Sequence, residues 1–210
     1  TLEEITVEAN PDDLSQEYLT ELAQTEINRL SIGIQSFVDD HLRFMNRRHD
    51  AASAVAAVEN ARDAGFRNIS VDLIYGIPGM TEGQWRSNLK KAVALAPEHI
   101  SAYHLTLEPD TPFGRKAASG QLHPVDEAAS ERQFYFLHEF LTGAGYEHYG
   151  VANFAKRVRR PRHNSSYLFA SPYLGIGLSA YSYDGGRIRR GSTATVHRYL
   201  DEPHAGHYIS

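Results

Sequence analysis

ISVDLIYGIPG (69–79) is the stretch that decides the fold, because its apolar, strand-like run ends abruptly in a Gly-Pro turn. Three more runs share this design: EITVEANP (4–11), RLSIGIQSF (29–37) and ISAYHLTLEPDTPF (100–113). Each run breaks into polar residues where a parallel sheet would present its carboxyl edge. The sequence therefore predicts four parallel strands with a ligand site at their carboxyl ends.

Helical patterns lie between these four runs. The clearest one follows the third run, where Thr81 and Gln84 have the spacing of a capping box and Pro97 ends the helix. Alternating strands and helices with short turns predict right-handed βαβ units. We expect the third and fourth strands to be apolar on both faces, as in sheets covered by helices on both sides. Four such units correspond to about half of an eight-unit barrel, or to most of a six-unit partial barrel.

The pattern of alternating strands and helices ends near residue 113. The sequence predicts an α/β fold in two parts, the last four units of a barrel over residues 1–113 and a small α+β cap over residues 114–210. The cap is expected to contain a polar connection (114–127), a helix (126–141), a basic loop (156–164), a short strand (187–191) and a closing helix from about Thr195.

Composition restricts the class of protein. The 210 residues are 41% hydrophobic and 22% charged, as in ordinary globular proteins, and no stretch has the roughly 18 apolar residues of a membrane span. A net charge of −5 argues against a general nucleic-acid binder. With no cysteine and no secretory signal, we expect a cytoplasmic protein, without disulfides and without a metal site in these residues. Because the chain opens at Thr1, close to a strand, we expect it to be part of a longer protein.

Polar residues at three successive strand ends form the predicted site. Glu8, Gln35 and Asp72 would line one rim of the sheet, and Arg47 would return to it after a helix at 38–46. Carboxylates and an amide suit hydroxyl and amino groups, while a guanidinium binds a carboxylate through two parallel hydrogen bonds. This combination fits a small zwitterionic ligand. The alternative is that Asp72 and Gln35 only cap strand ends and form turns.

Several motifs, in their order and spacing, resemble a known family: EANP, RLSIGIQSF, NRRH, VDLIYGIPGMT, HISAYHLTLEPDTPF, YGVANFAK and RHNSSY with YLGIG. The family is the oxygen-independent coproporphyrinogen III oxidase family of radical S-adenosylmethionine (SAM) proteins, and its haem-chaperone branch is the most similar. The resemblance implies a partial (β/α)6 barrel followed by a C-terminal cap. It also implies a [4Fe–4S] cluster on a CxxxCxxC loop and a Gly-rich SAM motif, neither of which occurs here. We therefore expect the cluster ligands to lie outside this chain, and the chain alone to be inactive in SAM cleavage.

The resemblance assigns SAM contacts residue by residue. They fall on Glu8, Gln35, Arg47, Asp72 and Thr106, with Ile74 near the adenine. Tyr103 and His104 follow on the last barrel strand, where they would either approach a substrate or serve as core aromatics.

Three functions remain open at this point. The first is a haem chaperone, which binds haem or a porphyrinogen and passes haem to receiving proteins. The second is an anaerobic coproporphyrinogen III oxidase, which decarboxylates propionates oxidatively in porphyrin biosynthesis. The third is an unrelated barrel that binds a small anionic metabolite. The motif HISAYHLTLEPDTPF favours the chaperone among the first two.

A possible haem contact lies in the cap. His163 and Asn164 stand where the chaperone branch has HNxxYW, and a neutral imidazole is a common axial haem ligand. Leu168, Tyr181 and Gly150 depart from the residues usual in the family, so the ligand specificity of the cap stays open. The cations expected to neutralise propionates are Lys156, Arg157, Arg159, Arg160 and Arg162. The alternative is a solvated basic loop with a hydrogen-bonded histidine.

Overall fold

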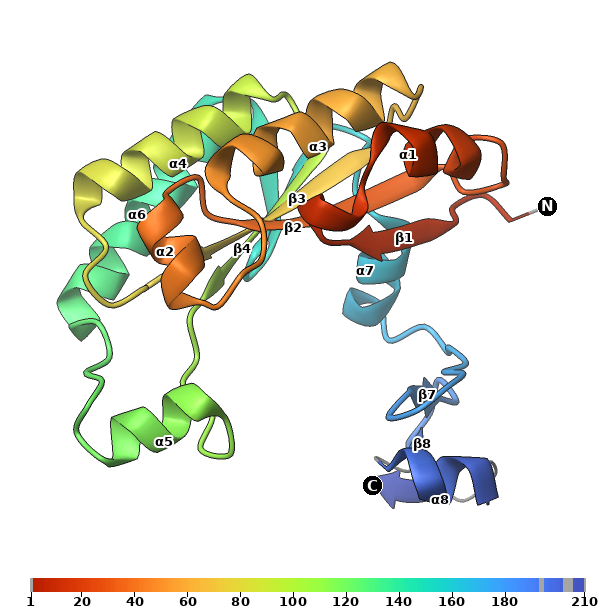
Figure 1. Cartoon of the computed structure of the whole chain (residues 1–210). Coiled ribbons are helices and arrows are strands. Elements are labelled where there is room, and N and C mark those ends of the chain that lie inside the picture. Colours follow the sequence, from red (N-terminus) through yellow and green to blue (C-terminus); the bar gives the residue numbers. More distant parts are fainter. Residues whose placement is uncertain (1, 193–194, 202–205, 210) are drawn as a thin grey trace. The chain divides into compact units, whose positions relative to one another are not determined.

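The computed structural model describes residues 2–192, 195–201 and 206–209. The chain divides into two compact units, Thr1–Arg160 and Pro161–Ser210. Figure 1 shows the helices and strands of both units along the chain. The first unit contains a six-stranded sheet, and the second contains a three-stranded sheet.

The six-stranded sheet confirms the four predicted parallel strands. Its strand order is β1-β2-β3-β4-β6-β5, and the first four strands pair in parallel. The last two strands are antiparallel, which extends the sheet beyond the barrel units. The strands are β1 (Thr6–Ala9), β2 (Arg29–Gln35), β3 (Ile69–Tyr75), β4 (His99–His104), β5 (Tyr146–Gly150) and β6 (Asn153–Lys156).

Helices connect these strands, and five of them have a first turn that is capped by a side chain. Thr81 and Gln84 form the predicted capping box, while Asp50 accepts a hydrogen bond of 2.7 Å from the backbone of Ser53. Figure 1 shows α1, α3, α4 and α6 along one side of the sheet. The elements are α1 (Gln16–Leu22), α2 (Asp39–Phe44), α3 (Ala51–Asp63), α4 (Glu82–Ala94), α5 (Pro112–Ala118), α6 (Glu127–Gly143) and the 3-10 turn η1 (Pro11–Asp13).

One face of the sheet is apolar and the other is polar. Ile32, Val71 and Ile100 pair across β2, β3 and β4 and are fully buried in the hydrophobic core. The opposite face carries the registered rows Ser31, Ser70 and His99, then Asp72 and Ser101. The expectation of two apolar faces is therefore wrong for these strands, because their second face carries polar side chains instead of packing on helices.

The segment after β4 differs from its prediction in one respect. The expected polar connection contains α5, whose first turn is capped by Thr111, with a hydrogen bond of 3.1 Å from the backbone of Gly114. The helix expected at 126–141 is confirmed as α6, with Asp126 as its N-cap. The domain boundary near 113 stays a prediction. It separates the parallel βα units from a segment whose strands β5 and β6 are antiparallel.

The second unit is small. The predicted loop at 156–164 is wrong from Arg162 onwards, because α7 begins there and Pro161 accepts a helical hydrogen bond from Ser165. The short strand and the helix from about Thr195 are confirmed as β8 and α8, but the helix does not close the unit, because the strand β9 follows it. No described helix is both long and apolar enough to cross a membrane. The elements are α7 (Arg162–Leu168), β7 (Tyr181–Tyr183), β8 (Arg189–Ser192), α8 (Val196–Asp201) and β9 (Gly206–Ile209).

Candidate functional site

A cavity of about 280 Å³ lies at the carboxyl ends of β1, β2 and β3, within the first unit. It brings together four residues that the sequence places on one rim, Glu8, Gln35, Arg47 and Asp72. The carboxyl edge of a parallel sheet is the usual place for a ligand site in such folds. The full lining comprises Glu8, Ala9, Asn10, Ser31, Gly33, Gln35, Arg47 and Asp72.

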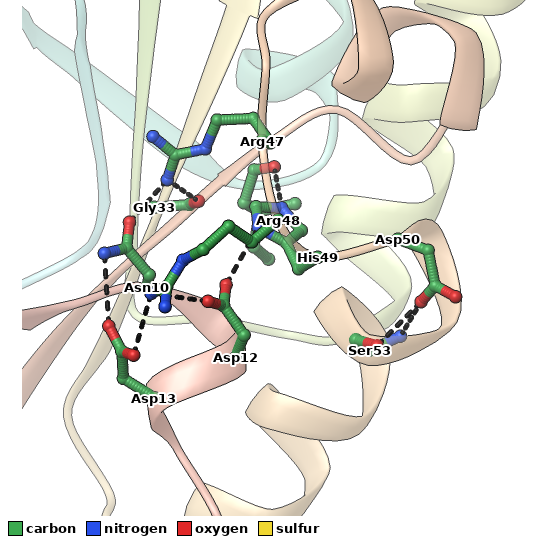
Figure 2. A network of polar contacts seen from close by, with 10 residues as sticks. Asn10, Asp12, Asp13, Gly33, Arg47, Arg48, His49, Asp50 and Ser53 are labelled. Atoms are coloured by element: carbon green, nitrogen blue, oxygen red, sulfur yellow. Dashed lines mark hydrogen bonds and ion pairs between the residues drawn. The ribbon is translucent and has the colours of Figure 1, made fainter.

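Arg47 reaches the cavity from the loop after α2. Its guanidinium donates hydrogen bonds to the side-chain oxygen of Asn10 and, at 3.3 Å, to the carbonyl oxygen of Gly33 (Figure 2). One nitrogen, Nη2, makes both contacts. The side chain is therefore fixed over the end of β2 by its partners.

The neighbours of Arg47 attach its loop to the sheet. Arg48 forms ion pairs of 2.6 Å with Asp12 and 2.9 Å with Asp13, both in η1. His49 is buried, and its Nε2 lies 3.0 Å from the carbonyl oxygen of Ile34 in β2 (Figure 2). Exposed ion pairs contribute at most about 1 kcal/mol each. The role of this network is to position the loop that carries Arg47, because it attaches this loop to η1, directly after β1, and to the end of β2.

The end of β2 has an unusual backbone. Gln35 has φ of 66°, a left-handed conformation that is uncommon for a residue with a side chain. The pairing with β3 shifts register between Ile32 and Gln35, as in a β-bulge. A Cβ atom on Gly33 would lie 2.9 Å from Nε2 of Gln35 and 3.4 Å from Nη2 of Arg47. Glycine at position 33 therefore leaves room for both the amide of Gln35 and the guanidinium of Arg47.

Asp72 is the most perturbed acid of the site. The pKa of its carboxyl is raised to about 6, mainly by burial and also by the nearby charge of Glu8. Hydrogen bonds from Ser101 and Ser31 and the charge of Arg29 act in the opposite direction. The carboxylate is thus partly desolvated but has hydroxyl partners, as expected of a group that accepts hydrogen bonds from a ligand.

A buried polar layer lies on the same face of the sheet, towards the other strand ends. Arg29 is buried and donates a hydrogen bond of 3.3 Å to Thr6. His99 is fully buried between Ser70 Oγ, 2.7 Å from Nδ1, and the hydroxyl of Tyr149, 2.8 Å from Nε2. Burial, followed by the charge of Arg29, lowers the pKa of His99 to about 3, so its imidazole is neutral.

The remaining predicted residues do not line the cavity. Ile74 lies two residues after Asp72 and pairs with Tyr103, so it shares the polar face. Thr106 is exposed and follows the end of β4. His104 packs edge-on against Tyr75, with 5.2 Å between ring centroids, which is an ordinary contact between aromatic side chains. His163 is exposed on α7, in the second unit.

Four lining residues were missed by sequence reasoning: Ala9, Asn10, Ser31 and Gly33. Asn10 belongs to EANP, next to the predicted Glu8, and Ser31 and Gly33 alternate with Gln35 along one strand. The period of two residues within β2 was therefore a usable signal. No described group of three or more histidine, aspartate and glutamate side chains has the arrangement of a metal site.

Comparisons with known proteins match this fold and this site region. The model of the radical SAM superfamily matches residues 2–92. Two relatives are named Heme chaperone HemW. The protein of Bacillus subtilis is 37% identical over 95% of this chain and 52% of its own length, and that of Escherichia coli is 35% identical over 94% and 54%. The solved structure of coproporphyrinogen III oxidase (HemN) from Escherichia coli covers 99% of this chain, with a TM-score of 0.79 and 24% identity.

The class of protein follows from the sheet, the rim and these matches: the chain has a radical SAM fold. Its family is that of the HemN- and HemW-like radical SAM proteins, and the chain belongs to it. The chain spans about half the length of the curated relatives it matches. The 24% identity to the oxidase structure carries the fold alone.

Proposed function

We propose that the cavity at the ends of β1, β2 and β3 binds SAM in the whole protein. The observation that carries this proposal is the gathering of two carboxylates, two amides and a guanidinium around one cavity of about 280 Å³. SAM offers a carboxylate, an amino group and ribose hydroxyls, so each of its polar groups has a partner of the right kind here. SAM bound at a [4Fe–4S] cluster supplies radical chemistry.

Each residue has one role in this proposal. Arg47 would bind the SAM carboxylate through two neighbouring guanidinium nitrogens, with Nη2 keeping its contact with Asn10 and exchanging its 3.3 Å contact with Gly33 for the ligand. Asp72 and Glu8 would accept hydrogen bonds from hydroxyl and amino groups, and the amide of Gln35 would complete the rim. Ile74 and Thr106 would contact the ligand from outside the cavity lining. The chain holds no cysteine, so the ligands of the cluster would come from other residues of the whole protein.

We further propose that the whole protein is a haem chaperone, which binds haem and passes it to haem-receiving proteins in the cytoplasm. Two relatives that match over nearly the whole chain are named heme chaperones, which supports this choice over the oxidase. His163 is the candidate axial ligand. It is exposed on α7, and its ring lies 4.9 Å from that of Tyr167.

The cations expected around haem differ in their availability. Arg160 pairs with Glu147 at 2.7 Å and Lys156 donates to the carbonyl of Ala96, so both are engaged within the first unit. Neither Arg157 nor Arg159 forms an ion pair with any residue that the structure describes. The basic segment therefore offers fewer free charges than its sequence indicates.

The experiment that tests the chaperone proposal is a titration of the whole protein with ferric haem. His163→Ala should shift the Soret band of bound haem and weaken binding, because the axial nitrogen is removed. His123→Ala is the matched control, since His123 is also exposed and lies in the first unit. A wild type that binds no haem, or a His163→Ala spectrum identical to that of the wild type, would contradict the proposal.

A further inference from the structure

The second unit contains a cavity that the motif at His163 does not account for. Its volume is about 320 Å³, and every lining residue belongs to the unit Pro161–Ser210. Three tyrosines and two arginines dominate the lining, which consists of Tyr167, Ala170, Ser171, Tyr173, Tyr183, Arg187 and Arg189. We call it the tyrosine–arginine pocket.

The three tyrosines form a row of neighbouring rings, the aromatic wall, with interplanar angles of 66° between Tyr167 and Tyr173 and 42° between Tyr173 and Tyr183. The ring centroids of Tyr167 and Tyr173 are 4.9 Å apart, and those of Tyr173 and Tyr183 are 6.0 Å apart. Tyr173 and Tyr183 exchange two backbone hydrogen bonds of 2.9 Å, so their side chains leave neighbouring backbone positions. Aromatic faces held in this way bind flat apolar rings without a large loss of side-chain entropy.

The arginines come from the turn and strand that follow. Asp184 accepts hydrogen bonds of 2.7 Å from the backbone of Gly186 and 3.2 Å from that of Ile188, which fixes the turn between β7 and β8. Arg187 lies in this turn, and Arg189 begins β8 with its guanidinium 6.0 Å from the ring centroid of Tyr183. Within residues 2–192, 195–201 and 206–209, neither guanidinium forms an ion pair.

Two exposed guanidinium groups beside an aromatic wall define the chemistry of the ligand. The wall suits a flat aromatic ring, and two arginines without acidic partners among the described residues suit carboxylates on the edge of that ring. The volume is at the lower end of the range for small-molecule sites, so the pocket would hold one edge of a large ring and leave the rest outside. His163 lies one helical turn before Tyr167 on α7, beside this wall.

We propose that the tyrosine–arginine pocket binds the carboxylate-bearing edge of a porphyrin, with the ring against the tyrosines and the two propionates on Arg187 and Arg189. The identity of the ring rests on the proposed haem function, whereas the pairing of carboxylates with these two arginines rests on the pocket itself. The propionate partners are thus placed at 187 and 189, and not in the basic segment at 156–162.

The test compares metal-free protoporphyrin with its dimethyl ester, which keeps the ring but lacks both carboxylates. Each is titrated into the 210-residue chain at neutral pH. The chain should bind the diacid at least about tenfold more tightly than the ester, because each charged hydrogen bond is worth more than 1 kcal/mol. Arg187→Gln combined with Arg189→Gln should bring this ratio close to one.

Two further double variants serve as controls for net charge and for folding. Arg157→Gln with Arg159→Gln removes the same charge from exposed positions outside the pocket, and should leave the ratio unchanged. Arg187→Lys with Arg189→Lys keeps the charge and should retain part of the preference, which also shows that the unit tolerates change at these positions.

The outcomes separate this inference from the proposed function. If the Arg187→Gln, Arg189→Gln chain still prefers the diacid as the wild type does, the pocket assignment is overturned while haem binding stands. If metal-free protoporphyrin binds with the expected arginine dependence but His163→Ala leaves the haem spectrum unchanged, the pocket is supported and the axial-ligand proposal falls. A wild type that binds neither porphyrin overturns the pocket assignment, while the haem proposal is decided by the ferric haem titration of the whole protein.

Discussion

Asp72→Asn should change the pH dependence of stability in a direction that the structure fixes. Burial raises the pKa of Asp72 to about 6, against an ordinary value near 3.9. Below about pH 4 the carboxyl is protonated in both the folded and the unfolded state, so its ionisation does not affect the free energy of unfolding. Above about pH 6 it is ionised in both states, and the desolvation of the buried carboxylate destabilises the folded state. The free energy of unfolding therefore falls by up to about 3 kcal/mol across this window, at about 1.4 kcal/mol per pKa unit.

The asparagine variant cannot ionise, so it should gain stability relative to the wild type as the pH rises from 4 to 7. The difference between the two chains is the quantity to measure, because His99 titrates with the opposite sign in an overlapping range. Urea unfolding of both chains at half-unit pH intervals gives this difference directly. A difference that stays constant from pH 4 to 7 would refute the reasoning that Asp72 is a desolvated carboxyl.

Two other predictions concern the same face of the sheet. His99 is neutral with a pKa of about 3, so the folded chain should lose stability as the pH falls from about 6.5 towards 3, and His99→Gln should flatten this slope in urea unfolding. Gly33→Ala should weaken SAM binding to the whole protein about tenfold, because the new Cβ would lie 2.9 Å from the amide of Gln35. Gly83→Ala is the matched control in calorimetry, since a Cβ there meets nothing closer than 4.0 Å, and an equal effect of both changes would contradict the prediction.

The parallel part of the fold could be predicted because its signals are local. A few neighbouring residues are enough to recognise a capping residue such as Thr81, the length of a strand or a polar strand end. The joining of β5 and β6 to the same sheet could not be read in this way, since it depends on pairing between strands distant in sequence, such as Ile100 with Phe154. Pairing of this kind leaves no periodic signal.

Part of the site could be predicted, because that part also depends on local signals. Strand alternation and topology placed Glu8 and Asp72 on one rim, and the structure brings both to one cavity. The contact of Arg47 with Asn10 depends on the path of a loop, which local patterns do not specify. The tyrosine–arginine pocket depends on a β-bridge between Tyr173 and Tyr183, so its residues carried no common pattern.

The central claim is that the cavity at the ends of β1, β2 and β3 binds SAM through Arg47. Calorimetric titration of the whole protein with SAM tests it most directly, with Arg47→Lys compared with Arg48→Lys. Arg47→Lys should weaken binding by about 1.5–3 kcal/mol, because lysine keeps the charge but loses the paired donors. Arg48→Lys should leave the affinity unchanged, since a lysine keeps the charge that pairs with Asp12 and Asp13 and position 48 does not line the cavity. Equal affinities for the wild type and Arg47→Lys would contradict the account.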